Sequence, residues 1–248
     1  MQTGWQFWTI GAIAALLVGI AKTGVPGMGI LVVPIVAMIF PAKASVGALL
    51  PLLLAGDVAA VLFFRRHANW PVLWGLMPWT FAGIALATLA LHGISDAVLK
   101  PMLGAIILVL LALELARQRF QWLNVPHQKG VTAFAGTLTG FATTVGNVAG
   151  PVANIFLIGK GFVKKEFMGT VAWYFLIINA SKVPIFYHLN MISADSLRFD
   201  LILLPVLAVG GIIGRLLLNK ISDRLFQAMV MLLAAAAAVK LLWNGIAT

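Results

Sequence analysis

Several apolar runs, each about as long as a membrane-spanning helix, follow one another along this chain. Examples are residues 44–64, 71–91 and 97–116. A helix needs about 20 apolar residues to cross the hydrocarbon core of a bilayer. The composition agrees, since 62% of the 248 residues are hydrophobic and only 10% are charged, whereas a soluble domain carries roughly a quarter charged residues. The chain is therefore predicted to be an all-α polytopic membrane protein.

Two further apolar segments, residues 5–40 and 130–159, are each interrupted near the middle. The interruptions are residues 21–29 (AKTGVPGMG) and residues 143–150 (TTVGNVAG). Glycine and proline break a helix and leave backbone groups unpaired, and Lys22 places a charge where charge is costly. Helix breaks at matching places in two halves are the usual sequence sign of a transporter's binding site.

Small motifs recur in the same order in the two halves, which indicates an internal duplication. Pro78, Gly83 and Ile94-Ser95-Asp96 correspond to Pro205, Gly210 and Ile221-Ser222-Asp223 at an offset of 127, and Gly19, Ala21, Thr23 and Gly29 correspond to Gly140, Ala142, Thr144 and Gly150 at an offset of 121. We expect an N-terminal repeat over residues 1–120, with a broken helical hairpin (5–40) and three spans (44–64, 71–91, 97–116). We expect a C-terminal repeat over residues 130–248, with a hairpin (130–159) and three spans (166–187, 199–219, 225–243).

The distribution of Lys and Arg decides between two arrangements of the broken segments. If each segment crosses the membrane once, the basic residues divide almost evenly between the two faces. If each segment is a hairpin that returns to the same side, one face collects Arg65, Arg66, Arg117, Arg119, Lys129, Lys160, Lys164, Lys165, Lys220 and Arg224, and the other keeps Lys43, Lys100 and Arg198. The positive-inside rule favours the hairpins. They predict two inverted repeats, both termini outside, short hairpin arms and tips that point toward each other.

The hairpin tips carry the first group of candidate binding residues. These are Lys22, Thr23, Gly24, Thr143, Thr144, Gly146 and Asn147. Glycines let the backbone turn, free N–H groups at helix N-termini attract anions, and the other side chains add hydrogen-bond donors and a full positive charge. Two alternatives remain open: the glycines and threonines serve close helix packing, or Lys22 reaches out to the membrane interface.

A second group of candidates, Asp57, Asn179 and Lys182, lies inside the spans that follow the hairpins. Asp57 and Asn179 occupy corresponding places in the two halves, 122 residues apart. Ionisable residues at mid-span are functional candidates, and we expect them to line the site or to gate it, with Asp57 paired to a lysine. A purely structural ion pair between the halves is the alternative.

Catalysis and cofactor binding find little support. The chain has no cysteine, which excludes disulfides, iron–sulfur clusters and thiolate zinc sites. It has no phosphate-binding loop and no G-x-S-x-G motif, and Ser181 and Lys182 are adjacent in a helix, so their side chains diverge by about 100°. We therefore expect no enzyme, no metal and no cofactor. The basic residues cluster at the ends of apolar runs, which favours contact with the lipid bilayer rather than nucleic acid.

Three sequence elements together resemble the TauE/SafE sulfite exporter family. They are residues 19–29 (GIAKTGVPGMG), the span that contains Asp57 and ends in Arg65-Arg66, and residues 179–184 (NASKVP). The resemblance covers essentially the whole chain and implies a multi-pass inner-membrane protein that moves sulfite, sulfoacetate or related organosulfonates. The second hairpin lacks the lysine of the common pattern, which predicts an asymmetric site.

The sequence thus predicts a secondary transporter of small sulfur-containing anions that works by alternating access. Lys22 is expected to supply charge, and the other tip residues are expected to supply hydrogen bonds. A passive anion channel of the same architecture is the alternative, and a membrane-embedded enzyme is the rival from another class. The sequence leaves open the direction of transport, the oligomeric state and a coupling ion, either a proton or sodium.

Overall fold

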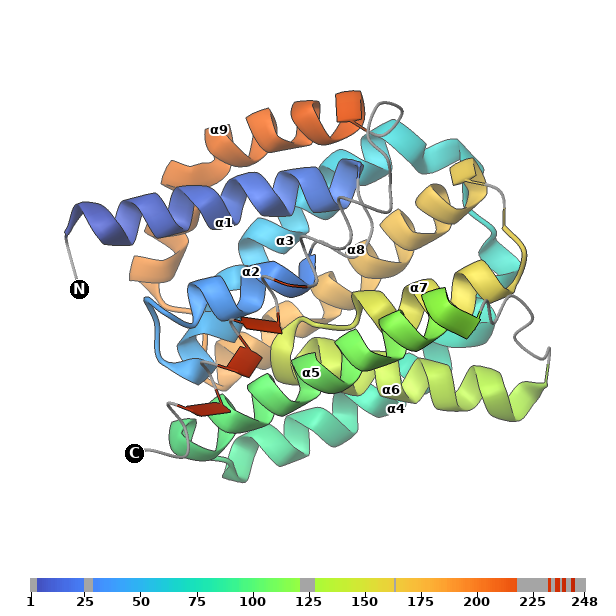
Figure 1. Ribbon diagram of the computed structural model, residues 1–248, viewed down its shortest axis with the longest axis horizontal. Coiled ribbons are helices and arrows are strands. Elements are labelled where there is room, and N and C mark those ends of the chain that lie inside the picture. Colours follow the sequence, from blue (N-terminus) through green and yellow to red (C-terminus); the bar gives the residue numbers. More distant parts are fainter. Residues whose placement is uncertain are drawn as a thin grey trace.

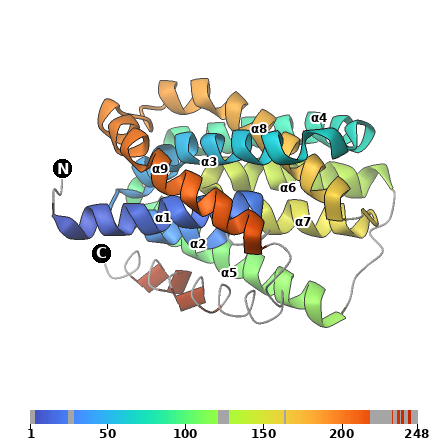
Figure 2. The ribbon, with the colours of Figure 1, turned by 90° about the horizontal axis from the view of Figure 1, so that it is seen from above.

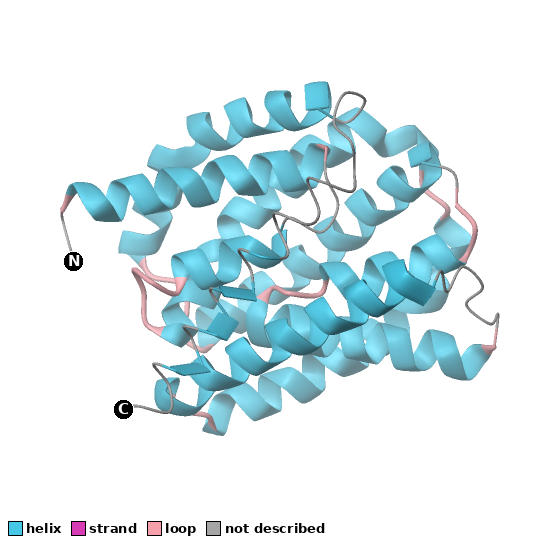
Figure 3. Cartoon of the chain, viewed as in Figure 1, coloured by secondary structure: helices cyan, strands magenta, loops and turns pink. Residues whose placement is uncertain are grey.

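The computed structural model describes residues 4–24, 29–120, 128–162 and 164–217, together with seven isolated positions between 232 and 243. Within these ranges every regular element is a helix (Figure 3). In chain order they are α1 (Trp5–Thr23), α2 (Gly29–Val36), α3 (Ala42–Phe64), η1 (Arg65–His67), α4 (Trp70–Gly93), α5 (Asp96–Phe120), α6 (Lys129–Gly146), α7 (Gly150–Gly159), α8 (Lys164–His188) and α9 (Ala194–Leu217). The all-α prediction is confirmed. Of the expected last span, 225–243, only those seven positions are described.

Six of the described helical segments are long and apolar enough to cross a membrane. They are Trp5–Thr23, Ala42–His67, Trp70–Gly93, Asp96–Leu113, Lys165–His188 and Ala194–Leu217. Large hydrophobic side chains such as Trp74, Leu89 and Leu201 are exposed on the outside of the bundle. An apolar exterior is what a lipid environment allows, so the structure agrees with a multi-pass membrane protein.

The chain breaks its helices at both expected places. α1 ends at Thr23, and α2 begins at Gly29. The second break is narrower than its sequence motif, because α6 continues to Gly146 and α7 begins at Gly150. Asn147 ends α6 in the left-handed conformation (φ 54°), and the N–H of Val148 bonds back to the carbonyl of Ala142 at 3.3 Å. This pattern is a common helix C-terminus that asparagine tolerates well.

The arms of the first hairpin differ in length from the expectation. α1 has 19 residues and α2 has 8, which at about 1.5 Å per residue gives lengths of roughly 28 and 12 Å. The first arm is therefore nearly as long as the hydrocarbon core is thick, and only the second arm is short. α5 also exceeds its expected range, since the predicted span ended at residue 116 and the helix continues to Phe120.

Helices from opposite halves of the chain pack side by side. α1 lies along α9, α4 lies along α6, and α3 contacts α8 in the middle of the bundle (Figures 1 and 2). The main hydrophobic core runs between these helices and includes Val18, Leu52, Met77, Phe167 and Phe199. Each half is thus held together largely by helices of the other half, which places the two helix breaks in the interior.

Glycines explain how closely the α1–α9 and α4–α6 pairs approach. A Cβ atom on Gly19 would overlap the carbonyl oxygen of Leu207, and one on Gly140 would overlap the carbonyl oxygen of Thr80. Small residues allow this backbone contact between membrane helices. A second glycine in each interface makes an equivalent contact. A Cβ atom on Gly83 would overlap the carbonyl oxygen of Thr137, and one on Gly210 would overlap the carbonyl oxygen of Leu16. The partners correspond at the offsets of 121 and 127 that relate the two halves of the sequence.

Candidate functional site

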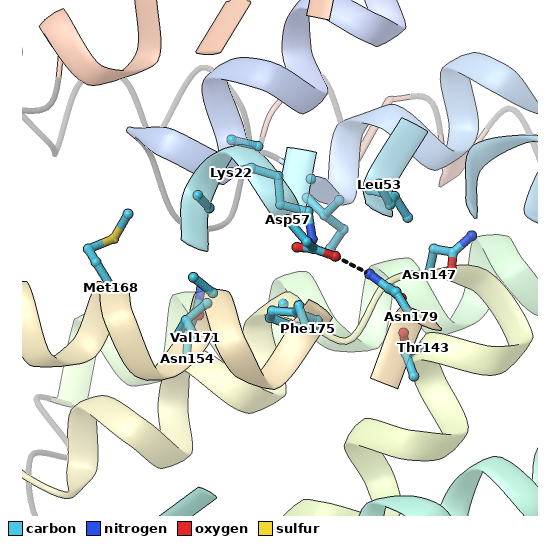
Figure 4. A pocket seen from close by; sticks show the side chains of 16 residues that line it. Lys22, Leu53, Asp57, Thr143, Asn147, Asn154, Met168, Val171, Phe175 and Asn179 are labelled. Atoms are coloured by element: carbon cyan, nitrogen blue, oxygen red, sulfur yellow. Dashed lines mark hydrogen bonds and ion pairs between the residues drawn. The ribbon is translucent and has the colours of Figure 1, made fainter. Parts of the chain in front are cut away.

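A central cavity lies where the two helix breaks meet α3 and α8 (Figure 4). Its volume is about 80 Å³, several times the ~10–15 Å³ that a single water molecule requires. Lys22 and Gly29 line it from the first break, and Asn147 and Gly150 line it from the second. The cavity is therefore large enough for a small ion and is bordered by both breaks.

Asp57 is the polar centre of one wall. Its Oδ1 atom lies 2.6 Å from the Nζ atom of Lys22, and its Oδ2 atom accepts a hydrogen bond of 2.6 Å from Nδ2 of Asn179. Asp57 is fully buried, whereas the side chain of Lys22 keeps 16% of its surface exposed. The expected pairing of Asp57 with a lysine is present, and the partner is Lys22. This contact joins α1, α3 and α8 at one point.

Lys22 also contacts an aromatic face. Its ammonium group lies 4.6 Å from the centre of the Phe175 ring on α8. A cation over an aromatic ring is stabilised by the ring quadrupole, most strongly where water is excluded. The carboxylate and the ring together hold the lysine at the cavity instead of letting it reach the membrane interface.

Lys182 supplies a second ammonium group just behind the cavity wall. It is fully buried, and its Nζ atom donates to the carbonyl of Thr143 at 2.9 Å, to Oγ1 of Thr143 at 2.9 Å and to Oδ1 of Asn147 at 2.7 Å. All three donors of the ammonium group are thus used. Asn147 in turn donates to the carbonyl of Val46 on α3 at 2.9 Å. Lys182 therefore fixes the second helix break against α3 and α8.

Each helix break consequently has a lysine, although only the first carries one in its own sequence. Lys22 belongs to the first break, and Lys182 reaches the second break from α8. Among the described residues, the two breaks thus bring together two lysines and the one acid Asp57. The N-terminal residues of α2 and α7, Gly29 and Gly150, also border the cavity. Helix N-termini carry partial positive charge, so the site favours an anion.

The structure divides the sequence-predicted residues into two groups. Lys22, Asp57, Thr143, Asn147 and Asn179 line the cavity, and Lys182 supports its wall. The remaining four residues, Thr23, Gly24, Thr144 and Gly146, do not line it.

Packing and backbone contacts account for the four residues outside the cavity lining. Oγ1 of Thr23 bonds to the carbonyl of Gly211 on α9 at 2.7 Å, and Oγ1 of Thr144 bonds within its own helix to the carbonyl of Gly140 at 2.9 Å. A Cβ atom on Gly24 would overlap the backbone of Gly214, and a Cβ atom on Gly146 would lie 2.5 Å from the side chain of Leu103. These contacts correspond to the helix-packing alternative.

The sequence interpretation did not select several other residues that line the cavity, among them Asn154, Met168 and Phe175. Asn154 is a buried amide in the otherwise apolar helix α7. A polar side chain in a membrane helix is costly unless it has a partner or a function, and this signal could have revealed it. Met168 and Phe175 look like ordinary core residues and give no such signal.

Comparison with protein families decides the identity of the chain. The family described as sulfite exporter TauE/SafE matches residues 11–241, a range that includes both helix breaks. The chain belongs to the TauE/SafE family. A search of the curated proteins found no match, and neither did a search of the solved structures. TauE/SafE proteins are membrane transporters, so this chain is a transporter and not an enzyme.

The role of Lys182 in this TauE/SafE protein can be tested by Lys182→Met, which keeps the apolar stem and removes the ammonium group. Oδ1 of Asn147 then loses its donor, whereas the carbonyl of Thr143 keeps the backbone N–H of Asn147. We expect a loss of unfolding free energy of about 1–3 kcal/mol for each acceptor left without a partner. Thermal unfolding in detergent measures it, with Ser181→Ala on the same turn as the control. Equal melting temperatures for wild type and Lys182→Met would show that the contacts carry no stability.

Proposed function

We propose that this protein is a secondary transporter of small sulfur-containing anions, namely sulfite, sulfoacetate or related organosulfonates. The anion binds in the central cavity and crosses the membrane by alternating access. The observation that carries the proposal is the position of Lys22, whose ammonium group faces a cavity bordered by the N-termini of α2 and α7. Sulfite and sulfonate groups have several oxygen acceptors, which suit a lysine and convergent N–H donors.

Side-chain hydrogen bonds complete the proposed site. The hydroxyl of Thr143 accepts from Lys182, which leaves its own proton free to donate. The amide nitrogen of Asn147 uses one of its two protons on the carbonyl of Val46. Lys22, Thr143 and Asn147 are therefore proposed as direct contacts, while Thr23, Gly24, Thr144 and Gly146 keep the helices in place.

Two inverted repeats would give the cavity two equivalent access routes. Corresponding residues contact one another at the centre, since Asn179 bonds directly to Asp57. A residue can contact the equivalent residue of the other repeat only near the axis that relates the two repeats. The glycine contacts of α1–α9 and α4–α6 correspond in the same way. A site close to such an axis, between helix breaks, is the arrangement expected for alternating access.

The proposed orientation follows from the basic residues. With both broken segments as hairpins, ten Lys and Arg side chains lie on one face and three on the other, so the richer face is cytoplasmic and both termini are outside. A cysteine introduced at Thr248 would then react with an impermeant reagent added from outside. Labelling from the cytoplasmic side alone would contradict this topology.

Uptake into proteoliposomes tests the function. The purified protein should move labelled sulfite or sulfoacetate with saturation, and excess unlabelled anion inside the vesicles should accelerate the exchange. Electrical conductance far above transporter turnover would instead support the passive anion channel. No flux of any of these anions above that of protein-free vesicles would contradict the proposal.

A further inference from the structure

The positive charge of Lys22 is already paired with the carboxylate of Asp57 in this structure. Its Nζ atom lies 2.6 Å from Oδ1 of Asp57, within the wall that lines the cavity. An anion that binds Lys22 therefore meets a carboxylate that holds the same ammonium group. Asp57 therefore competes with the anion for Lys22. The anion must either displace the Asp57 carboxylate from Lys22 or bind when Asp57 is uncharged.

We propose that Asp57 is a proton-binding site, and that it takes up one proton when the cavity binds its anion. This inference rests on the proposed function. Asp57 is fully buried, so a carboxylate released from Lys22 has no water to solvate it. A second negative charge in the same small cavity would repel it as well. Protonation removes both costs, because the neutral acid no longer competes for the lysine.

Among the described residues, no further cation is free to replace Lys22 as the partner of Asp57. The helices packed against α3 are α1, α2, α5, α8 and α9, together with η1. Two lysines interact electrostatically with Asp57, Lys22 from α1 and Lys182 from α8. The ammonium group of Lys182 is already bonded to Thr143 and Asn147. α2 contributes no ionisable residue.

Several other charged side chains on these elements lie near the ends of α3. The carboxylate of Asp96 on α5 accepts from the backbone of Lys43 near the start of α3. Arg215 of α9 covers the ring of Phe63, and Arg65, Arg66 and His67 form η1 just beyond it. Asp200, on α9, is a second buried acid. It follows Phe199, which packs on Gly11 of α1, and Gly11 lies eleven residues before Lys22 in that helix.

Asn179 can serve Asp57 in both protonation states. In the present state its Nδ2 donates to the carboxylate, and its Oδ1 is buried without a hydrogen-bond partner. Rotation of the amide by half a turn exchanges the two atoms, so that Oδ1 faces Asp57. A protonated Asp57 then donates its O–H to Oδ1. The same residue thus stabilises the charged acid in the empty site and the neutral acid in the loaded site.

The charge balance follows directly. Without the anion Lys22 and Asp57 neutralise each other, and with the anion Lys22 neutralises one negative charge of the anion while Asp57 carries the proton. Anion and proton therefore bind together without changing the charge of this pair. Transport of a monoanion would then be electroneutral, with one proton accompanying each anion in whichever direction it moves.

Calorimetry of binding tests the proton site directly. Sulfoacetate is the probe, because its two acid groups stay ionised between about pH 6 and 8, whereas sulfite exchanges its own proton in that range. Titrations of the purified protein in buffers of different ionisation enthalpy give the number of protons taken up per anion. We expect close to one proton per anion for the wild type. Its affinity for the anion should fall by up to about tenfold for each unit by which the pH rises. Asp57→Asn should take up none and bind with an affinity independent of pH.

Asp200→Asn is the matched control, because Asp200 is also a buried acid in an apolar helix but does not line the cavity. It should keep the proton uptake of the wild type. Three results would contradict the proton site: anion binding by the wild type without proton uptake, proton uptake that persists in Asp57→Asn, and proton uptake that is lost in Asp200→Asn. None of them contradicts the anion site. No binding of sulfoacetate or sulfite at any pH contradicts the proposed function, and the proton site falls with it. The wild-type titration needs no substitution, so the test does not depend on how a variant folds.

Discussion

Lys22→Ala is expected to lower the affinity for sulfite by about 10- to 100-fold. The ammonium group of Lys22 is the one that faces the cavity directly, since Lys182 is bonded to Thr143 and Asn147 in the wall. A hydrogen bond to a charged group contributes about 1.5–3 kcal/mol, and each 1.4 kcal/mol is a factor of ten in affinity. Equilibrium binding to the purified protein measures the loss.

A double variant separates the loss of binding from a loss of folding. Breaking the buried pair by removing one partner costs roughly 3–5 kcal/mol of stability, so Lys22→Ala alone is expected to melt at a lower temperature. Lys22→Ala combined with Asp57→Asn removes both charges and should recover much of that stability without recovering anion binding. Lys22→Arg keeps the charge and should keep part of the affinity. Unchanged affinity in Lys22→Ala would overturn the role assigned to this lysine.

Gly19→Leu and Gly140→Leu are expected to disrupt the packing of the two halves. A side chain at either glycine meets a backbone carbonyl of the partner helix, at Leu207 in α9 or at Thr80 in α4. Overpacking a well-packed core costs about 1–3 kcal/mol and occasionally more. Here the obstacle is backbone, which cannot move aside as a side chain would, so we expect a loss at or above about 3 kcal/mol in each variant. Thermal unfolding and the yield of monodisperse protein in detergent measure it.

Gly75 provides the control for these two variants, because a Cβ atom at this position of α4 meets nothing within 4 Å. Gly75→Leu should melt close to the wild type. Gly19→Leu and Gly140→Leu should lose similar amounts of stability, because their contacts correspond between the halves. A melting temperature of either variant equal to that of Gly75→Leu would contradict the packing account.

Much of this arrangement could be predicted from the sequence because the membrane restricts the choices. Apolar length predicts helices, and the glycines and the lysine at residues 21–29 predict the first break. The expected pairing of Asp57 with a lysine is also present, with Lys22 as the partner. The sequence shows that Asp57 and Asn179 correspond, and likewise Gly19 and Gly140, but it did not predict the Asp57–Asn179 hydrogen bond or the close packing at these glycines.

Contacts between distant parts of the chain could not be predicted in this way. Thr23 looked like a donor at the hairpin tip, but its hydroxyl bonds to Gly211, 188 residues later. Lys182 follows the second break by 35 residues, and nothing in the spacing shows that its ammonium group reaches Asn147. Helical periodicity tells which residues share a face, but not which helix that face meets. The lysine that the second hairpin lacks in sequence is therefore supplied by a tertiary contact.

The location of a bound anion is the measurement that tests the central claim most directly. Selenite is the selenium analogue of sulfite, and selenium gives an anomalous diffraction signal that identifies it in a crystal. In crystals of the protein soaked with selenite, we expect an anomalous peak in the central cavity, within hydrogen-bond distance of Nζ of Lys22 and beside the N-terminus of α7. The contradicting result is a protein that transports sulfite but binds selenite elsewhere, with no anomalous peak in this cavity. The anion would then not bind at Lys22.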